Sequence, residues 1–353
     1  MLDATVLDRI GNTPLVRLDR VAAGLPVPVY GKCEFLNPGG SIKDRIALAI
    51  VNDAEARGEL KPGTTLVEAT AGNTGVGLAL VAAVRGYKLA CVMPEKMCTD
   101  KRAALAALGA EVIVTANTPP SDPRNFRRVA ERLATERGWF LTNQFANPAN
   151  PDVHERTTGP EIVAQCGAQL GAAVKPGSAG DRPRVPTAAA VKPGSAGDRP
   201  RVPIGAFVCG VGTGGTITGV GRALKNRTPG VRIVLADPVG SRLAHFVDSR
   251  HPDHDAGYKV EGIGGSEPPA VLDLSVIDAA ERVSDEESFA MTLRLIREEG
   301  LLVGGSSGTA VVAALRVAAR GDVLGPVVAI LADSWDRYYS TDWMRGKMTS
   351  AGV

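Results

Sequence analysis

The chain has 353 residues, of which 44% are hydrophobic and 22% are charged, as is typical of a soluble globular protein with a large core. Aromatic residues make up only 4%, which argues against an aromatic platform for nucleic acid. The net charge of +2 hides an uneven distribution, because residues 172–186 and 189–203 are identical copies that each carry +2. The remainder therefore has a net charge of −2, and neither a nucleic-acid nor a membrane partner is expected.

Strand-like and helix-like segments alternate along the chain, which predicts an α/β fold with mostly parallel strands covered on both faces. In chain order the pattern predicts strand 29–35, helix 42–56, strand 65–68, helix 76–85, strand 89–93, helix 100–108, strand 111–114, strand 206–211, helix 217–226, strand 231–237, helices 286–299 and 307–319, and strand 327–332.

The segment 171–203 does not follow this pattern. It is rich in proline, glycine, serine and arginine, has no helical or strand period, and contains both copies of the repeat. Such a composition and a tandem duplication predict a surface loop whose length is tolerated.

The cysteines and the N-terminal residues indicate a compartment. Five scattered cysteines without CxxC spacing favour reduced thiols over disulfides or a zinc site. The N-terminal stretch MLDATVLDRIGNTPL lacks a basic start and an apolar signal core, and the longest apolar stretch, 76–84, is too short for a bilayer. A cytoplasmic protein without a bound metal is expected.

Four glycine-rich turns carry the chemistry. Lys43 follows the turn Asn37–Ser41, and three further turns lie at Thr70–Gly75, Gly210–Thr216 and Gly304–Gly308. In open α/β sheets such turns follow the carboxyl ends of strands, where ligands bind. One lysine with three small-residue loops suits an enzyme that holds an anionic, aldehyde-bearing cofactor, pyridoxal 5'-phosphate (PLP), as a Schiff base on Lys43.

Each turn also has a second interpretation. The amides of Gly212–Thr216 at a helix start could cradle the PLP phosphate, but Gly210, Gly212 and Gly215 also satisfy the dinucleotide pattern G-x-G-x-x-G, with Asp237 ending the next strand. An NAD-dependent oxidoreductase is therefore the alternative from a different class, although it leaves Lys43 without a role.

Helix capping is the competing interpretation for the remaining positions. Residues 70–74 could hold a carboxylate or cap a helix, and Ser306 could meet a pyridine nitrogen or cap a helix. A lysine such as Lys43, taken alone, is usually a surface residue. The conjunction of four such turns in one α/β chain favours the PLP enzyme.

With these motifs the chain resembles the cysteine synthase and cystathionine β-synthase family of fold-type II PLP enzymes. The resemblance runs from Gly11-Asn12-Thr13-Pro14-Leu15 to about Met344, interrupted by the repeat. It implies two parallel-sheet-based domains with the active site between them. The large PLP-anchoring domain would comprise 1–44 and 151–353, with 171–203 as a loop insert, and the smaller mobile substrate-binding domain would comprise 45–150.

The resemblance also implies roles for single residues. Lys43 would be the Schiff-base lysine and proton carrier at Cα, Asn73 would bond the cofactor's ring oxygen, and Ser306 would face the pyridine nitrogen. The phosphate would be bound by Gly212, Thr213, Gly214, Gly215 and Thr216. The substrate would be held by Thr70, Ala71, Gly72, Asn73, Thr74, Gln144 and Gly262.

The implied reaction is a β-replacement in sulfur amino-acid biosynthesis. Serine or an O-activated serine would lose its β-substituent through an aminoacrylate intermediate, and a sulfur nucleophile would then add, with a homodimer as the expected assembly. The motifs Pro94–Met97, Asp237–Ser241 and Ala332-Asp333-Ser334 resemble the cystathionine β-synthase branch.

Two departures from the family pattern leave alternatives open. Ala71 stands where the family usually has serine, and Gly265–Pro269 replaces an aromatic-containing stretch. These departures leave room for a different nucleophile in specialised amino-acid biosynthesis, or for a protein of this fold that has lost activity.

Overall fold

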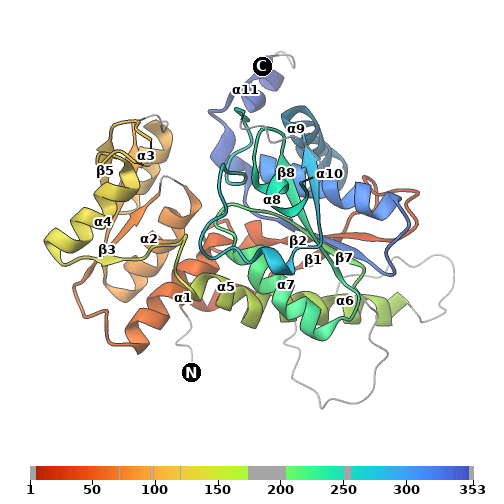
Figure 1. Cartoon of the computed structure of the whole chain (residues 1–353), viewed down its shortest axis with the longest axis horizontal. Helices are drawn as coiled ribbons and strands as arrows, with labels where there is room; N and C mark the ends of the chain where they lie inside the picture. Colours follow the sequence, from red (N-terminus) through yellow and green to blue (C-terminus); the bar gives the residue numbers. More distant parts are fainter. Residues whose placement is uncertain are drawn as a thin grey trace.

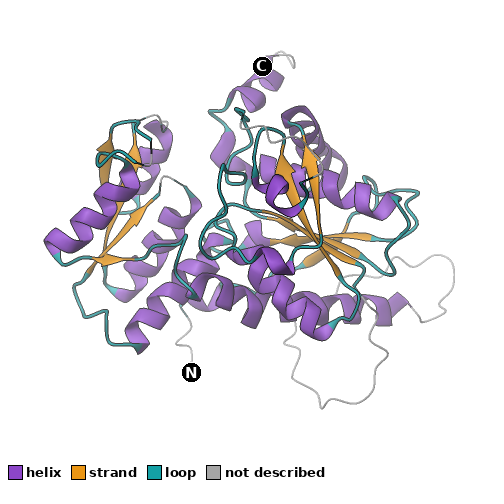
Figure 2. Cartoon of the chain, viewed as in Figure 1, coloured by secondary structure: helices purple, strands orange, loops and turns teal. Residues whose placement is uncertain are grey.

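The computed structural model describes residues 5–349 apart from 71, 96, 98, 120, 174–203 and 250–255. Two groups of strands, each flanked by helices, lie side by side (Figures 1 and 2). The helix α1 lies low between the two groups, next to α5. Among the described residues, no helix is long and apolar enough to cross a membrane.

The larger sheet has six strands. All neighbouring pairs are parallel except the first, in which β1 runs antiparallel to β2. Its central strand β10, VVAIL, is buried along its whole length, as expected for a parallel strand covered on both faces. The strand order is β1(Leu15–Arg17), β2(Val29–Cys33), β10(Val327–Leu331), β7(Ala206–Gly210), β8(Arg232–Pro238) and β9(Ala279–Val283).

The smaller sheet has four strands, all parallel. Its central strands β3 and β4 carry the buried apolar residues, whereas β5 and β6 at the edges are only partly buried. The strand order is β5(Glu111–Thr115), β4(Lys88–Pro94), β3(Thr65–Ala69) and β6(Phe140–Leu141).

Helices cover both sheets. Those in the N-terminal half are α1(Lys43–Ala56), α2(Asn73–Arg85), α3(Thr99–Ala107), α4(Phe126–Arg137), α5(Ala149–Val153) and α6(Gly159–Ala173). The others are α7(Gly215–Arg227), α8(Leu243–Val247), α9(Asp285–Arg294), α10(Gly305–Ala319) and α11(Asp342–Thr349).

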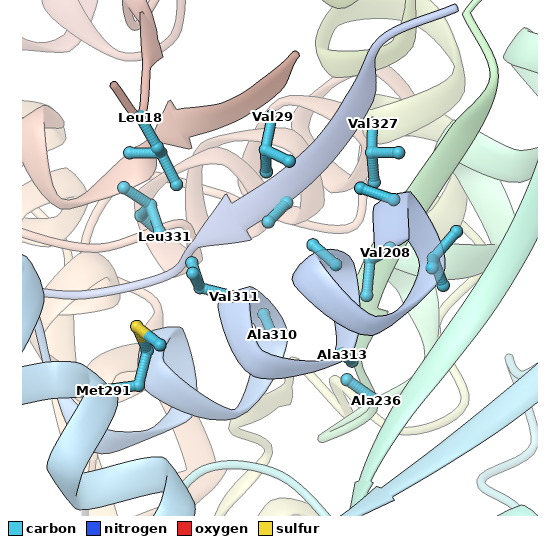
Figure 3. Close-up of a cluster of buried hydrophobic side chains, with 14 of the residues drawn as sticks. Leu18, Val29, Val208, Ala236, Met291, Ala310, Val311, Ala313, Val327 and Leu331 are labelled. Atoms are coloured by element: carbon cyan, nitrogen blue, oxygen red, sulfur yellow. The ribbon is translucent and has the colours of Figure 1, made fainter. Parts of the chain in front are cut away.

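The alanine-rich helix α10 forms the core on one face of the large sheet. Figure 3 shows Val311 of this helix next to Leu331 of β10 and Ala313 next to Ala236 of β8, within one cluster of buried residues. Because alanine has a short side chain, the helix backbone comes close to the sheet, and the close packing fixes where its N-terminus points. That N-terminus carries Ser306.

The predicted elements match the structure within a few residues at most ends, with two corrections. The strand expected over 29–35 ends at Cys33, and a 3-10 turn, Glu34–Leu36, follows. The buried Glu34 carboxylate accepts hydrogen bonds from the Arg45 guanidinium at 2.7 and 2.8 Å, so the first residue of this turn is tied to α1. The helix expected over 286–299 changes at Leu295 into a π-turn, Leu295–Glu299.

Candidate active site

A cavity of about 690 Å³ is lined by residues from both sheet units. Its size lies within the usual range for small-molecule sites. The turns after β3 and β7 open into it, so it lies at the carboxyl ends of parallel strands, where open α/β sheets bind ligands. We call it the active-site cavity.

Lys43 is the first residue of α1, and its half-buried side chain lines the cavity. Burial lowers the pKa of the Lys43 amine because a charged ammonium is poorly solvated there, and the Asp333 carboxylate opposes this shift. A lysine with a lowered pKa is more often deprotonated, and the neutral amine is the form that attacks an aldehyde or accepts a proton.

The turn Gly212–Thr216 forms a cradle between β7 and α7. Gly214 has a φ of 90°, which favours glycine, and a Cβ at Gly212 would clash with the Gly262 carbonyl oxygen. Because Gly212, Gly214 and Gly215 have no side chains, backbone amides at the start of α7 are left uncovered, which is the arrangement that binds phosphate.

Two side chains hold the hydroxyl groups of this cradle. The Asn150 side-chain amide donates to Thr213 Oγ1 at 3.0 Å, and His154 Nε2 lies 3.2 Å from Thr216 Oγ1. Burial lowers the pKa of His154 to about 3, so the imidazole is neutral at physiological pH.

The turn after β3 presents polar groups to the same cavity. The Thr74 hydroxyl donates to Gln144 Oε1 at 2.6 Å, and the Gly72 amide donates to Thr70 Oγ1 at 3.2 Å. The Asn73 side-chain amide donates to Asp333 Oδ2 at 2.7 Å. Ala71, expected to contact substrate, lies outside the described residues.

Ser306 is the second residue of α10, which begins at Gly305, two residues before the expected start at 307. The side chain is 6% exposed and lines the cavity. Its hydroxyl makes no hydrogen bond within the described part of the chain, so it is not used as a helix cap and is available to a ligand.

The cavity wall contains every described residue of the expected site except Gly215. Gly215 lies at the start of α7, where a Cβ would clash with the Asn150 side chain, so it allows close packing behind the cradle. The sequence interpretation missed cavity residues from other elements, namely Lys101, Arg127, Glu261, Asp333 and Tyr338.

Asp333 is the missed residue with the clearest signal. It follows β10 closely, so the rule that ligands bind at strand carboxyl ends could have located it. Its Oδ2 accepts hydrogen bonds from Asn73 and, at 2.6 Å, from the Tyr338 hydroxyl, and burial raises its pKa.

The donor set fits pyridoxal phosphate. It combines a lysine of lowered pKa, an amide cradle that a Cβ would fill and an uncommitted hydroxyl at a helix start, all in one cavity. Among the described residues, no cluster of histidine, cysteine, aspartate and glutamate could hold a metal ion.

A family described as pyridoxal-phosphate dependent enzyme matches residues 6–183 and 196–333, and the chain belongs to that family. The match confirms the α/β fold-type II class, the enzyme class and the PLP cofactor expected from the motifs. Its break, between residues 183 and 196, falls within the repeated segment.

Within this family the chain is similar to proteins named cystathionine beta-synthase. The chain is 41% identical to cystathionine beta-synthase of Mus musculus, over 97% of this chain and 56% of that protein. It is 42% identical to cystathionine beta-synthase of Apis mellifera, over 94% of this chain and 60% of that protein. The chain thus spans little more than half the length of these relatives.

Two solved structures resemble the chain over almost its whole length. O-ureido-L-serine synthase superposes with a TM-score of 0.80 and is 36% identical, over 98% of this chain and 96% of that one. A lysine-to-alanine variant of that synthase, with O-ureido-L-serine bound, superposes with a TM-score of 0.78 at 35% identity, over 100% and 99% of the two chains.

The dinucleotide alternative is wrong. The family match assigns PLP, and Asp237, which would have held a ribose, is fully buried. The Asp237 carboxylate accepts a hydrogen bond from the Ala244 amide at 2.8 Å and is not part of the cavity wall.

Proposed function

We propose that this chain replaces the β-substituent of serine or an O-activated serine with a sulfur nucleophile, as a cystathionine β-synthase-type or cysteine synthase-type enzyme. One observation carries the proposal: Lys43, the amide cradle, Ser306 and the Thr70–Thr74 turn line a single cavity. The names of the relatives, which are synthases that form serine derivatives or cystathionine, support it.

Several residues would hold the cofactor. The amides and hydroxyls of Gly212–Thr216 would bind its phosphate, and Ser306 would meet its ring nitrogen. Asn73 would contact its ring oxygen, and Lys43 would bind its aldehyde covalently. Bound PLP supplies an electron sink that makes the Cα–H of an amino acid acidic.

Lys43 would carry the proton. Its amine, kept partly neutral by burial, would remove the proton from Cα and later return it to the same atom. The Asp333 carboxylate would help by fixing the amide of Asn73, which keeps the cofactor ring in place beside that amine.

The turn after β3 would orient the substrate. The Thr70 hydroxyl and the Gln144 side-chain NH2 would bind the carboxylate, and the Gly72 amide and the Thr74 hydroxyl would hold these two groups in place by the hydrogen bonds that they donate. This arrangement would leave the β-carbon facing the open part of the cavity. At the pyridine nitrogen Ser306 would offer a neutral hydroxyl, whereas a carboxylate would favour protonation of that nitrogen. The cofactor would then be a weaker electron sink, which favours prompt loss of the β-substituent.

A different nucleophile is the second candidate function. The likeness to O-ureido-L-serine synthase over nearly the whole chain favours it, since that name implies a nucleophile other than a thiol.

With either nucleophile, the segment 45–150 is proposed as a mobile substrate-binding domain that moves against a PLP-anchoring domain of 1–44 and 151–353. The ion pair between Lys101 of α3 and Glu261 would hold the two together across the cavity.

Assembly and location complete the proposal. A homodimer is proposed from the resemblance, and a cytoplasmic location from the buried free thiols of Cys33, Cys91, Cys166 and Cys209.

Turnover measurements test the function. Serine, O-acetylserine and O-phosphoserine are each combined with sulfide and with homocysteine, and the products are identified by mass spectrometry. At least one pair should give a β-substituted alanine, and Lys43→Ala should lower the rate about 10³-fold or more because the proton carrier is lost. Absence of product from every pair, or a Lys43→Ala enzyme of undiminished rate, would contradict the proposal.

A further inference from the structure

Arg127 extends into the active-site cavity from a helix that the sequence analysis did not anticipate. It is the second residue of α4 and lines the cavity with Gln144 and Phe145. The Arg127 guanidinium carbon lies 4.3 Å from the centre of the Phe145 ring and 5.7 Å from that of Phe126. The two rings limit how the guanidinium can move and leave its N–H groups free in its own plane.

Within the described part of the chain the Arg127 guanidinium makes neither an ion pair nor a hydrogen bond, and only the more distant carboxylates of Glu68 and Glu131 act on its charge. Other cations of the cavity wall are engaged: Lys101 pairs with Glu261, and Arg337 donates to the Gly39 carbonyl. Arginine presents five donors, so a ligand that supplies anionic oxygens would find them unused.

Helix stability does not explain an arginine at this position. A helix N-terminus carries a partial positive charge that disfavours cations, and the first turn of α4 contains no acidic residue. Asn125 caps the helix, and its Oδ1 accepts a hydrogen bond from the backbone amide of Arg127 at 3.1 Å. The cap therefore does not depend on the Arg127 side chain. A residue that breaks a local rule in this way is expected at a functional site.

We propose that Arg127 forms a subsite for an anionic group that a substrate carries beyond its reacting β-carbon. The inference rests on the proposed function and specifies its substrate class. A planar guanidinium binds a phosphate or a carboxylate through two parallel hydrogen bonds. Such a group has two sources here: the phosphate of O-phosphoserine, which leaves, or the carboxylate of an amino-acid nucleophile such as homocysteine.

Arg127→Gln tests the subsite, with Arg128→Gln as its matched control. Arg128 is the next residue, pairs with Glu131 at 3.0 Å on the surface and does not line the cavity. Arg127→Gln should raise the KM for the anion-bearing substrate about 10-fold to 100-fold, the effect of losing one charge-assisted pair. The KM values for O-acetylserine with sulfide serve as the reference, because this pair carries no such anion, and Arg127→Gln should leave them unchanged. Arg128→Gln should change the KM of no substrate.

The two arms identify the source of the anion. If Arg127→Gln raises the KM for O-phosphoserine, with sulfide as nucleophile, the subsite binds the leaving group. If it raises the KM for homocysteine, with O-acetylserine as donor, the subsite binds the nucleophile. A change in neither, or an equal change for all pairs, would overturn the subsite while leaving β-replacement intact.

A binding measurement separates this inference from the proposed function. Inorganic phosphate is titrated calorimetrically into the PLP-loaded proteins, in which the cradle is already filled. Wild type and Arg128→Gln should bind it at least about tenfold more tightly than Arg127→Gln, even if no β-replacement is found. Equal affinity, or no binding to any of the three, refutes the subsite whatever the turnover shows.

Discussion

Asp237 illustrates how the surroundings of a residue decide between two functions that share a motif. It is the last residue but one of β8, the strand that follows the glycine-rich turn and α7, which is the position at which dinucleotide-binding proteins hold a ribose. In this chain the carboxylate is buried and accepts from the Ala244 amide at the start of α8. The motif is visible in the sequence, but whether the carboxylate faces a ligand or a helix depends on packing that the motif does not contain.

Burial of Asp237 gives a prediction about pH. Burial raises its pKa from 3.8 to about 6, so between these values the folded protein binds more protons than the unfolded chain. Its stabilising contribution is therefore complete below about pH 4 and is lost as pH rises through about 6. Relative to Asp237→Asn, wild type should lose up to about 3 kcal/mol in free energy of unfolding across this window. Urea unfolding at a series of pH values measures the free energy of unfolding of both proteins. If it depended on pH in the same way for wild type and Asp237→Asn, the assignment would be contradicted.

At the scale of elements, close packing of α7 against α5 and the π-turn His154–Thr158 holds the phosphate cradle. A Cβ at Gly219 would clash with the Pro151 carbonyl oxygen and would lie 2.8 Å from His154 Cβ. The same segment supplies Asn150 and His154 to the cradle hydroxyls. If α7 moved away from α5 and the π-turn, the side chains of Asn150 and His154, which orient Thr213 and Thr216, would therefore shift relative to the cradle.

Gly219→Ala should destabilise the protein by about 1 to 3 kcal/mol, because backbone lies in the way of the new methyl group. It should also weaken PLP binding, read from the recovery of cofactor fluorescence on reconstitution. Gly167→Ala on α6 is the matched control, because no atom lies within 4 Å of its Cβ position. That change should stabilise by about 0.4 to 1 kcal/mol and leave PLP binding unaltered. Equal effects of the two substitutions would show that α7 packing does not position the cradle.

The sequence predicted the bodies of the elements better than their ends. Periodic apolar residues located α2, α7 and α10, yet these helices begin earlier than expected, at Asn73, Gly215 and Gly305. Glycine and asparagine are weak helix formers, so these first turns depend on tertiary contacts that periodicity does not report. The short strands Leu15–Arg17, Phe140–Leu141 and Ala279–Val283 escaped detection for a related reason, since they are only partly buried.

At the scale of the whole molecule, the site could be predicted where glycine-rich turns mark it and could not where other elements complete it. Lys43, the cradle and Ser306 carry local signals in the sequence. Arg127 and Asp333 reach the cavity from α4 and from the segment after β10, and no local pattern states that these segments meet. Their roles depend on how the two sheet units lie beside each other (Figure 1).

The domain division and the repeat remain predictions at this scale. The structure contains two sheets, and the cavity draws residues from both units, which is the arrangement that a mobile smaller domain would need. Residues 174–203 lie outside the described residues, and the family match is interrupted inside the same segment.

Trapping of the cofactor on the intact protein tests the central claim most directly. The PLP-loaded protein is reduced with borohydride and digested, and its peptides are mapped by mass spectrometry, with Lys43→Ala treated in parallel. We predict a pyridoxyl adduct on the peptide that contains Lys43, and none on the variant, because the lowered pKa and the position of that amine in the cavity suit it to hold the aldehyde. An adduct on another lysine, or no adduct on a protein that retains PLP, would contradict the account.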